Sequence, residues 1–495
     1  MKQQGKVWLV GAGPGDLSLF TLKGKTILEQ AQVVLYDNLV SPDILSLIPS
    51  NAQRIDVGKR AGNHPIPQEE INHLLLQKAQ QGLRVVRLKG GDPFLFGRGG
   101  EELMLLTQHQ IPFEVVPGVS SALAVPACTG IPVTHRGLAS SVHIITGHKQ
   151  QNQPTNLDFP ILAKLQGTLV FLMGLSELET ICTGLQNAGM PGTTPAAVIS
   201  RGSTAHQQQI LSDLQTLPQQ AANANLQPPA IIVIGAVCTL AEHLHWKDLL
   251  PLSHSHILVT RPRTASSTLA QQLRQYGAQV TELPAIAIES LPDTAALHRQ
   301  LQTLHTIHWI AFTSPTAVSL FFDHLKSQRI DVRTLTHMQF AAVGPATQAA
   351  IEAYGIFTAY TPPTYNAHAL LQGLAKIVQP NQTVLLPRAQ AGVPLPPTPF
   401  PLIDLPIYRT IPQALLSHST IDATAVAFAS ASAVNAFCRA IPLQNRAHLT
   451  AYCIGPQTAA QAKTNGFASC ITAPQATISA LVQTIVQTET TNKGV

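Results

Sequence analysis

The sequence predicts an α/β protein of several domains, and three observations lead to this fold class. The chain has 495 residues, which is too long for a single ordinary hydrophobic core, so two to four domains are expected. Short apolar runs such as KVWLVG, VVLYD and TLVFLMG alternate with helical patterns such as PQEEINHLLLQKAQQG, which is typical of sheets covered by helices on both faces. Hydrophobic residues make up 45% of the chain and charged residues 12%, so compact cores are expected throughout.

Composition and cysteine usage narrow the class of protein. The start, MKQQGKVWLVGAGPGD, lacks the apolar block of a signal peptide, and no run reaches membrane-spanning length. The six cysteines form no CxxC pair, so we expect reduced structural thiols, no metal site, and a cytoplasmic protein that has no membrane partner. The net charge of +5, without a Lys/Arg run, argues against a nucleic-acid partner and suits a small acidic substrate.

A polar stretch divides the chain into two halves. HLHWKDLLPLSHSH, at residues 243–256, follows the apolar run AIIVIGAV and precedes a new apolar run, ILVT. We therefore expect a linker at residues 248–255, between a first half at residues 1–247 and a second half at residues 256–495.

The second half contains an internal repeat, which predicts a duplicated α/β unit. WIAFTSPTAVSLFF at 309–322 matches AVAFASASAVNAFC at 425–438, and FAAVGPATQAA at 340–350 matches TAYCIGPQTAA at 450–460. ILVTRP also pairs with VLLPRA, and LPAI with LPIY. Two similar domains facing each other across a cleft would form a natural ligand site. The alternative is a chance similarity of short strand-and-turn segments.

A glycine loop follows the first apolar run and has the general form of a dinucleotide-binding loop. It reads VGAGPGD over residues 10–16, and Asp37 lies about twenty residues further on, where a ribose-binding acid would stand. A nicotinamide-dependent dehydrogenase is therefore the competing interpretation. Against it, the third glycine position, which must be small, is Asp16, and Pro14 lacks an N–H that a pyrophosphate would bind. The loop favours close approach to a different ligand.

The ordered motifs of the first half resemble the uroporphyrinogen-III C-methyltransferases of the tetrapyrrole methylase family. They are VGAGPGDLSLFTLKG, VVLYDNLVS, VGKRAGNHPIPQEEIN, RLKGGDPFLFGRGGEE, VPGVSSALAVPACTGIPVTHRG, TGH, FLMG and PPAIIVIGAV, and they span essentially all of residues 5–247. The resemblance implies the tetrapyrrole-methylase fold, with two α/β subdomains and a cleft, and S-adenosylmethionine as methyl donor. It also implies methylation of uroporphyrinogen III at C2 and C7, giving precorrin-1 and then precorrin-2, by a homodimer formed through this half.

Three charged residues match positions that carry the chemistry in this family. An electron-rich pyrrole carbon attacks the sulfonium methyl group in line, so the protein mainly aligns the two reactants. Asp37 matches the proposed base, Lys59 in VGKR matches the proposed proton donor, and Arg98 in FGRGGEE can hold a substrate carboxylate. Simpler explanations exist, because Asp37 could cap the following turn and Lys59 could be a solvated surface residue. Arg98 could likewise pair with Glu101 or Glu102.

The family pattern assigns ten positions to S-adenosylmethionine. Glycines and small residues permit backbone contact with the adenosine, and Asp92 can address the positively charged part of the methionine moiety. For Met173, packing in a core is the simpler explanation. Asn38 stands where many members have arginine, and Ser120-Ser121 where a Thr-Ala pair is common. The ten positions are Pro14, Gly90, Gly91, Asp92, Leu95, Ser120, Ser121, Met173, Gly202 and Ala230.

The second half resembles uroporphyrinogen-III synthase over about residues 256–490. The motifs that carry this resemblance are ILVTRP, AFTSPTAV, AVGPAT, LPIYRT and IGPQTAA. It implies a two-domain α/β fold, which we expect to divide into residues 256–287 plus 412–495 and residues 288–411. It also implies closure of hydroxymethylbilane into a macrocycle with its last pyrrole inverted, which would supply the substrate of the first half. Tyr408 in LPIYRT matches the tyrosine usually proposed to assist departure of the hydroxyl group.

Further candidates in the second half concern substrate binding. Thr347, Ser430 and Thr458 lie at turns of the two repeats and could donate to substrate carboxylates, although ordinary turn chemistry explains them equally well. Arg261 and Arg388 occupy matching repeat positions and could bind acetate or propionate groups, or pair with protein carboxylates. A second half that binds a tetrapyrrole without catalysing its formation is the alternative to a synthase.

Overall fold

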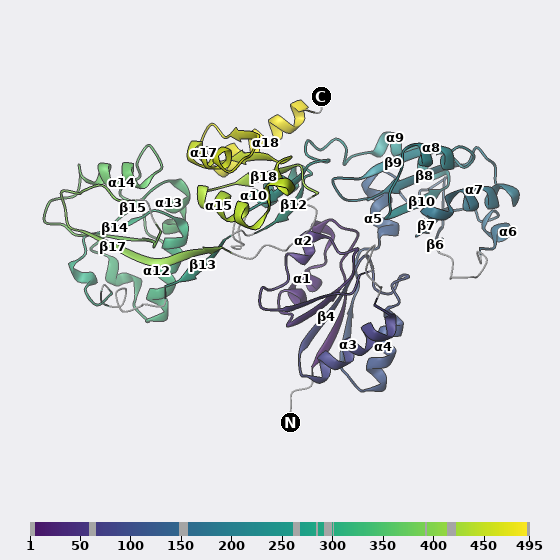
Figure 1. Ribbon diagram of the computed structural model, residues 1–495, viewed down its shortest axis with the longest axis horizontal. Helices are drawn as coiled ribbons and strands as arrows, with labels where there is room; N and C mark the ends of the chain where they lie inside the picture. Colours follow the sequence, from purple (N-terminus) through teal and green to yellow (C-terminus); the bar gives the residue numbers. More distant parts are fainter. Residues whose placement is uncertain are drawn as a thin grey trace.

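The described part of the chain forms four five-stranded sheets. Each sheet has its own helices and forms one lobe, and we number these lobes 1 to 4 in chain order (Figure 1). In Figure 1, lobe 1 is purple, lobe 2 lies to the right, lobe 3 is central and carries the yellow C-terminal helix, and lobe 4 is green at the far left. This architecture confirms the predicted α/β class. The computed structural model describes residues 5–58, 66–147, 157–260, 268–283, 286–291, 299, 301–391, 394–412 and 422–492.

Lobe 1 is a parallel sheet with the strand order β3-β2-β4-β1-β5. The strand β1, which lies between β4 and β5, is buried on both faces, since Leu9 packs in one core and Val10 in the other. The carboxyl ends of its strands meet at one edge, where open parallel sheets bind ligands. Its elements are β1 (Lys6–Gly11), η1 (Leu17–Leu19), α1 (Leu22–Leu28), β2 (Val33–Tyr36), α2 (Pro42–Leu45), β3 (Gln53–Asp56), α3 (Gln68–Gln80), β4 (Arg84–Lys89), α4 (Gly99–Gln108) and β5 (Phe113–Val116).

Lobe 2 is a mixed sheet with the order β6-β7-β10-β8-β9, in which only the β6–β7 pair is parallel. The helix α5 leads into it from lobe 1 and packs on its core through Ala122 and Val125. Its elements are α5 (Ser121–Cys128), β6 (Val142–Thr146), α6 (Phe159–Leu162), β7 (Thr168–Leu172), η2 (Leu175–Glu177), α7 (Leu178–Asn187), β8 (Pro195–Ser200), β9 (Gln208–Asp213), α8 (Leu217–Asn223), β10 (Ala230–Ile234), η3 (Ala236–Leu240) and α9 (Ala241–Leu244).

Lobe 3 is a parallel sheet with the order β12-β11-β18-β19-β20, built from two separate stretches of the chain. Its elements are β11 (His256–Val259), α10 (Thr268–Gln275), β12 (Gln279–Glu282), β18 (Ala425–Phe428), α15 (Ala431–Ala440), α16 (Leu443–Arg446), β19 (Thr450–Cys453), α17 (Pro456–Thr464), β20 (Ser469–Thr472) and α18 (Ile478–Asn492).

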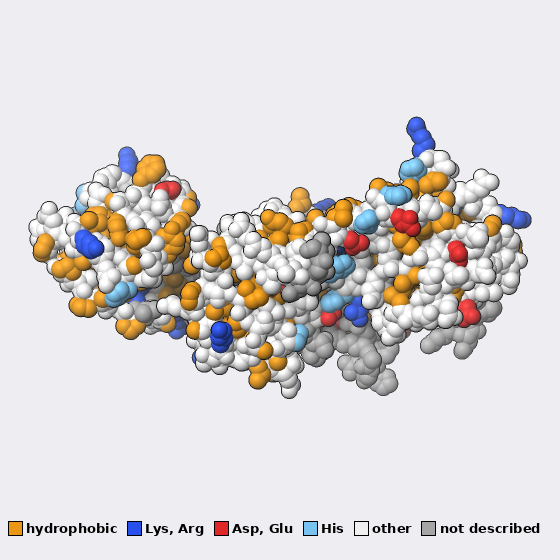
Figure 2. Space-filling model, turned by 90° about the horizontal axis from the view of Figure 1, so that it is seen from above, with side chains coloured by type: hydrophobic (Ala, Val, Ile, Leu, Met, Phe, Trp, Pro, Cys, Tyr) orange, Lys and Arg blue, Asp and Glu red, His pale blue; other side chains and the backbone are white. Residues whose placement is uncertain are grey.

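Lobe 4 has the order β13-β17-β16-β14-β15, with β13 antiparallel to β17. Seen from above, a notch separates this lobe from the rest of the molecule (Figure 2). Its elements are β13 (Ile286–Ser290), η4 (Leu304–Thr306), β14 (Trp309–Phe312), α12 (Pro315–Ser327), η5 (Val332–Leu335), β15 (Gln339–Ala342), α13 (Pro345–Glu352), α14 (Ala367–Leu374), β16 (Val384–Ala389) and β17 (Leu402–Pro412).

The internal repeat is confirmed by the two sheets of the second half. The neighbours β17-β16-β14-β15 of lobe 4 correspond to β12-β11-β18-β19 of lobe 3. Ser314 begins α12 and accepts a hydrogen bond from Ala317 N, as Ser430 does from Ala433 N at the start of α15. Lobes 3 and 4 are therefore two copies of one α/β unit.

The predicted domain boundaries in the second half fall inside two strands of lobe 4. The boundary at residues 287 and 288 falls inside β13, and the boundary at residues 411 and 412 falls inside β17, so these two strands connect the lobes. Within the expected linker, Leu252 is fully buried in the core of lobe 3.

All six cysteines are free thiols. No helix in the described part of the chain is long and apolar enough to cross a membrane.

Candidate active site

A cleft of about 320 Å³ opens at the carboxyl ends of the lobe 1 strands, and lobe 2 forms its opposite wall. The structure brings to this cleft all ten positions that the family pattern assigns to the methyl donor. Two of the three charged candidates also line it. The ten positions and these two residues are Pro14, Gly90, Gly91, Asp92, Leu95, Ser120, Ser121, Met173, Gly202, Ala230, Asp37 and Arg98.

Close backbone contacts among three glycines hold together the loops beside the cleft. A Cβ atom on Gly118 would lie 2.2 Å from Gly91 O, and one on Gly11 would lie 2.5 Å from Gly118 N. The loops after β1 and β4 are joined by two backbone bonds, from Gly13 N to Gly91 O at 3.1 Å and from Gly91 N to Gly13 O at 2.7 Å. Side chains are thus excluded where these loops meet, and backbone atoms are left to contact a ligand.

The acidic residues of these loops hold the backbone in place. The Asp92 carboxylate accepts hydrogen bonds from Phe94 N at 2.8 Å and from Gly118 N at 3.0 Å. The Asp16 carboxylate accepts from Ser18 N at 2.8 Å and so begins η1. This cap gives a physical reason for the departure of the loop from the dinucleotide pattern at this position.

Left-handed backbone conformations gather at the cleft. Phe96, Arg98 and Met173 all line it, and their φ angles are 54°, 55° and 56°. Residues other than glycine adopt this conformation at a free-energy cost and tend to do so at functional sites. Met173 is 51% exposed, so the simpler explanation of core packing is wrong.

Asp37 follows β2 and presents its carboxylate to the cleft with 25% of its side chain exposed. Its Oδ1 accepts a hydrogen bond from Leu39 N at 3.1 Å, so the residue also caps the turn that follows it. Its Oδ2 lies 3.9 Å from the guanidinium of Arg87. Arg98 pairs with Glu101 through two bonds of 2.9 and 2.6 Å. Lys59, the third charged candidate, lies outside the described residues.

Sequence reasoning missed a buried charged residue of the cleft, Lys89. Its ammonium group donates to Glu102 Oε1 at 2.8 Å, and the guanidinium of Arg87 donates to the same oxygen at 3.1 Å. Gln68 Nε2 donates to it as well, at 3.0 Å. Lys89 is the last residue of β4, directly before the predicted Gly90-Gly91-Asp92 turn. Its place at the carboxyl end of a central parallel strand was the signal that could have identified it.

In the second half, Tyr408 lies on β17 and is 8% exposed. Its hydroxyl group is 3.1 Å from Ser314 Oγ, the cap of α12. Sequence reasoning named Ser430 but missed Ser314, although the two serines occupy equivalent positions in the repeat.

The other described candidates of the second half are either buried or bonded to another residue of the protein. Thr347 and Thr458 are 2% and 5% exposed, in the first turns of α13 and α17. Arg388 donates two hydrogen bonds of 2.6 Å to Asp404, so the alternative of a protein carboxylate partner holds for it. Arg261 lies outside the described residues.

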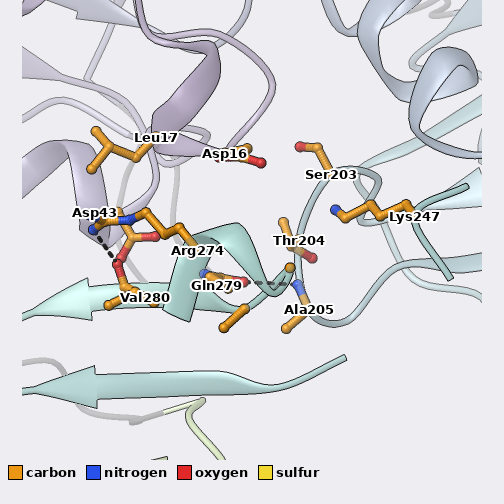
Figure 3. Close-up of a pocket in the computed structure, with 12 residues that line it drawn as sticks. Asp16, Leu17, Asp43, Ser203, Thr204, Ala205, Lys247, Arg274, Gln279 and Val280 are labelled. Atoms are coloured by element: carbon orange, nitrogen blue, oxygen red, sulfur yellow. Dashed lines mark hydrogen bonds between the residues drawn. The ribbon is translucent and has the colours of Figure 1, made fainter. Parts of the chain in front are cut away.

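A small pocket lies where the first half meets lobe 3 (Figure 3). Gln279 of β12 accepts a hydrogen bond from Ala205 N at 2.9 Å, which Figure 3 shows as a dashed line. Asp43 of α2 is hydrogen-bonded to the hydroxyl group of Thr281 on β12. Burial raises the pKa of Asp43 to about 7, although the hydrogen bond from Thr281 opposes this shift. The contact between the halves thus contains a carboxyl group that titrates near neutral pH.

Comparison with known proteins covers both halves. The model of the tetrapyrrole (corrin/porphyrin) methylases matches residues 6–218, and that of the uroporphyrinogen-III synthase HemD matches residues 267–483. A porphyrin biosynthesis protein HemD from Ruminiclostridium josui is 40% identical over 502 residues, which cover 98% of each chain. A uroporphyrinogen-III C-methyltransferase from Bacillus subtilis is 42% identical over 69% of this chain and 70% of its own length.

A siroheme synthase from Yersinia enterocolitica is 49% identical over 50% of this chain and 51% of its own length. These matches agree with the resemblances that the motifs of each half carry. The chain therefore belongs to the tetrapyrrole methylase family in its first half and to the uroporphyrinogen-III synthase family in its second.

Proposed function

We propose that the first half methylates uroporphyrinogen III at C2 and then C7, giving precorrin-2 through precorrin-1, and that the second half makes uroporphyrinogen III from hydroxymethylbilane. The observation that carries the first part is the single cleft, which gathers every described position that the family pattern assigns to the reaction. The fusion supports the second part, because the product of one reaction is the substrate of the other.

The residues of the cleft fit S-adenosylmethionine. Gly91 has φ of 65° and no atom within 4 Å of its Cβ position, so there is free space beside its Cα for a flat or extended ligand. Ser120, which caps α5, and Met173 offer small or apolar contacts on the side of lobe 2. The bound donor supplies an electrophilic methyl group. Because Asp92 already accepts two backbone hydrogen bonds, its first task is to hold the loops that form this wall.

Asp37 has the position and charge of a base in this cleft. A carbon–carbon bond would form between the pyrrole carbon and the methyl group as the bond from that methyl group to sulfur breaks and S-adenosylhomocysteine leaves, and a proton must then leave the macrocycle. The carboxylate at the end of β2 reaches the cleft, and Leu39 N fixes its orientation. The guanidinium of Arg98 stands at the same cleft and can bind a substrate carboxylate, provided that it exchanges its contact with Glu101.

The second half needs a group that assists departure of the hydroxyl from hydroxymethylbilane. Tyr408 can donate its O–H to that leaving group, and Ser314 Oγ at 3.1 Å can orient it. We infer further that the first half forms a homodimer. The family resemblance supports this, as do apolar side chains of this half that are exposed in the single chain, such as Leu22 at 85% and Met104 at 65%.

A binding module without catalytic activity is the second candidate for the second half, because Thr347 and Thr458 are buried and Arg388 is bonded to Asp404, which leaves fewer of the candidate side chains free to act on a substrate. The test gives the full chain hydroxymethylbilane and S-adenosylmethionine together and identifies the tetrapyrrole that forms. We expect precorrin-2 with both reactants, and uroporphyrinogen III when the methyl donor is omitted. Formation of the I isomer alone would contradict a synthase, and a lack of methylated product from supplied uroporphyrinogen III would contradict the methyltransferase.

A further inference from the structure

Four charged side chains form a continuous chain beneath the cleft. Asp37 lies 3.9 Å from Arg87, Arg87 lies 3.1 Å from Glu102, and Glu102 lies 2.8 Å from Lys89. The two ends of this series, Asp37 and Lys89, both line the cleft, whereas Arg87 and Glu102 are buried at 3% and 0% exposure. The two ends are therefore linked electrostatically through a buried ion pair, where water screens the interaction little.

The carboxylate of Glu102 is paired with two cations. Its Oε1 accepts from Arg87 and Lys89, while its Oε2 is buried without a hydrogen-bond partner among the described residues. Burial lowers the pKa of Lys89, and the charge of Arg87 adds to this effect, whereas Glu102 and Asp37 oppose it. The ammonium group is thus held by Glu102 and is close enough to sense the charge of Asp37.

The remaining charged groups among the described residues of the cleft have partners outside the buried series. Arg98 is paired with Glu101, and Asp92 accepts two backbone hydrogen bonds. Among the described residues that line the cleft, Asp37 and Lys89 are therefore the two charges whose balance depends on the buried series.

We propose that Lys89 and Glu102 are positioning residues for methyl transfer, which act through Arg87 to set the charge around Asp37 when it accepts the proton of the macrocycle. This inference rests on the proposed role of Asp37 as base. The charges alternate in sign along this series, so a change of charge at Lys89 or Glu102 alters the electrostatic surroundings of Asp37 through Arg87.

The test measures the pH dependence of kcat/KM for methylation of uroporphyrinogen III by the full chain, since its acidic limb reports the base of the free enzyme. Removal of the cation in Lys89→Gln is expected to move that limb upward by about one pH unit. Glu102→Gln removes the anion and is expected to move the limb downward. The double variant restores the charge balance, and its limb should return towards the wild-type position.

Two further variants separate charge from structure. Lys89→Arg keeps the cation and should leave the limb in place. Gln68→Leu removes one hydrogen bond to Glu102 without a change of charge, and should leave it in place as well. Because the two single variants are expected to move the limb in opposite directions, either one that folds tests the inference. Movement of both in the same direction, or no movement in a folded variant, would overturn it.

Asp37→Asn distinguishes failure of this inference from failure of the proposed function. If the acidic limb persists in Asp37→Asn, another group is the base and the proposed role of Asp37 is wrong. If the limb disappears in Asp37→Asn but does not move in Lys89→Gln, the role of Asp37 stands and only the inference about Lys89 and Glu102 is wrong.

Discussion

The two halves of the chain use their candidate residues in different ways. In the first half, loops from both lobes meet around one cleft, and the candidate side chains are turned into it. In the second half, Ser430 caps a helix, Arg388 binds Asp404, and Thr347 is buried. The difference teaches that the first half gathers its candidate residues around one cleft, whereas these candidates of the second half are engaged within the protein itself.

The largest effect that this difference predicts is at Asp37. Asp37→Asn keeps the side-chain shape and the hydrogen bond to Leu39 N but removes the base, so the methylation rate is expected to fall between about a hundredfold and ten-thousandfold. The measurement is formation of S-adenosylhomocysteine with uroporphyrinogen III. Asp56→Asn is the matched control, because Asp56 ends the neighbouring strand β3 and caps its own turn at Gly58 N. A full rate in Asp37→Asn would contradict the role assigned to Asp37.

The next effect concerns Asp43, where the two halves meet. Its pKa rises from 3.8 to about 7 because of burial, and Asp16 and Glu282 add to this, while Thr281 and Arg274 oppose it. A raised pKa means that the folded state is stabilised by protonated Asp43 below about pH 4, and that this contribution is lost as the pH rises to about 7. The loss has an upper bound of about 4 kcal/mol.

The measurement is the melting temperature of the wild type and of Asp43→Asn between pH 4 and 8. The wild type should lose stability relative to the variant as the pH rises through this range. Asp331→Asn is a control of opposite sign, because Arg333 lowers the pKa of exposed Asp331 to about 2. That variant should differ from the wild type in pH dependence only as the pH falls below about 4. A constant difference between the wild type and Asp43→Asn would show that Asp43 does not titrate in the contact.

The sequence predicted more of the first half than of the second, for physical reasons. Glycine loops at strand ends are local features, so their positions at the cleft follow from the order of motifs along the chain. The sequence did not single out Lys89, because its ion pair is with Glu102, which lies 13 residues away and contacts it only in the folded protein. The contact of Tyr408 with Ser314 joins residues 94 positions apart, and no local pattern encodes it.

A smaller effect is expected at Tyr408. If the second half acts chiefly through its shape, Tyr408→Phe should lower the rate of uroporphyrinogen III formation only about tenfold, which corresponds to about 1.4 kcal/mol. The product isomers from hydroxymethylbilane measure this rate against the spontaneous I isomer. A loss of a thousandfold or more would make the second half depend on one side chain, as the first half is expected to depend on Asp37.

The smallest effect is at the equivalent caps Ser314 and Ser430. Each Oγ accepts from the helix backbone, at 3.1 and 3.2 Å, so replacement of either serine by alanine should lower the free energy of unfolding by about 1 kcal/mol. Denaturant unfolding of the two variants measures this. Equal losses would mean that Ser430 acts as a cap, in agreement with its place in the duplicated unit. If Ser430→Ala left the stability unchanged but reduced formation of uroporphyrinogen III, the Ser430 hydroxyl group would act on the substrate. The second half would then depend on individual side chains, as the first half is expected to.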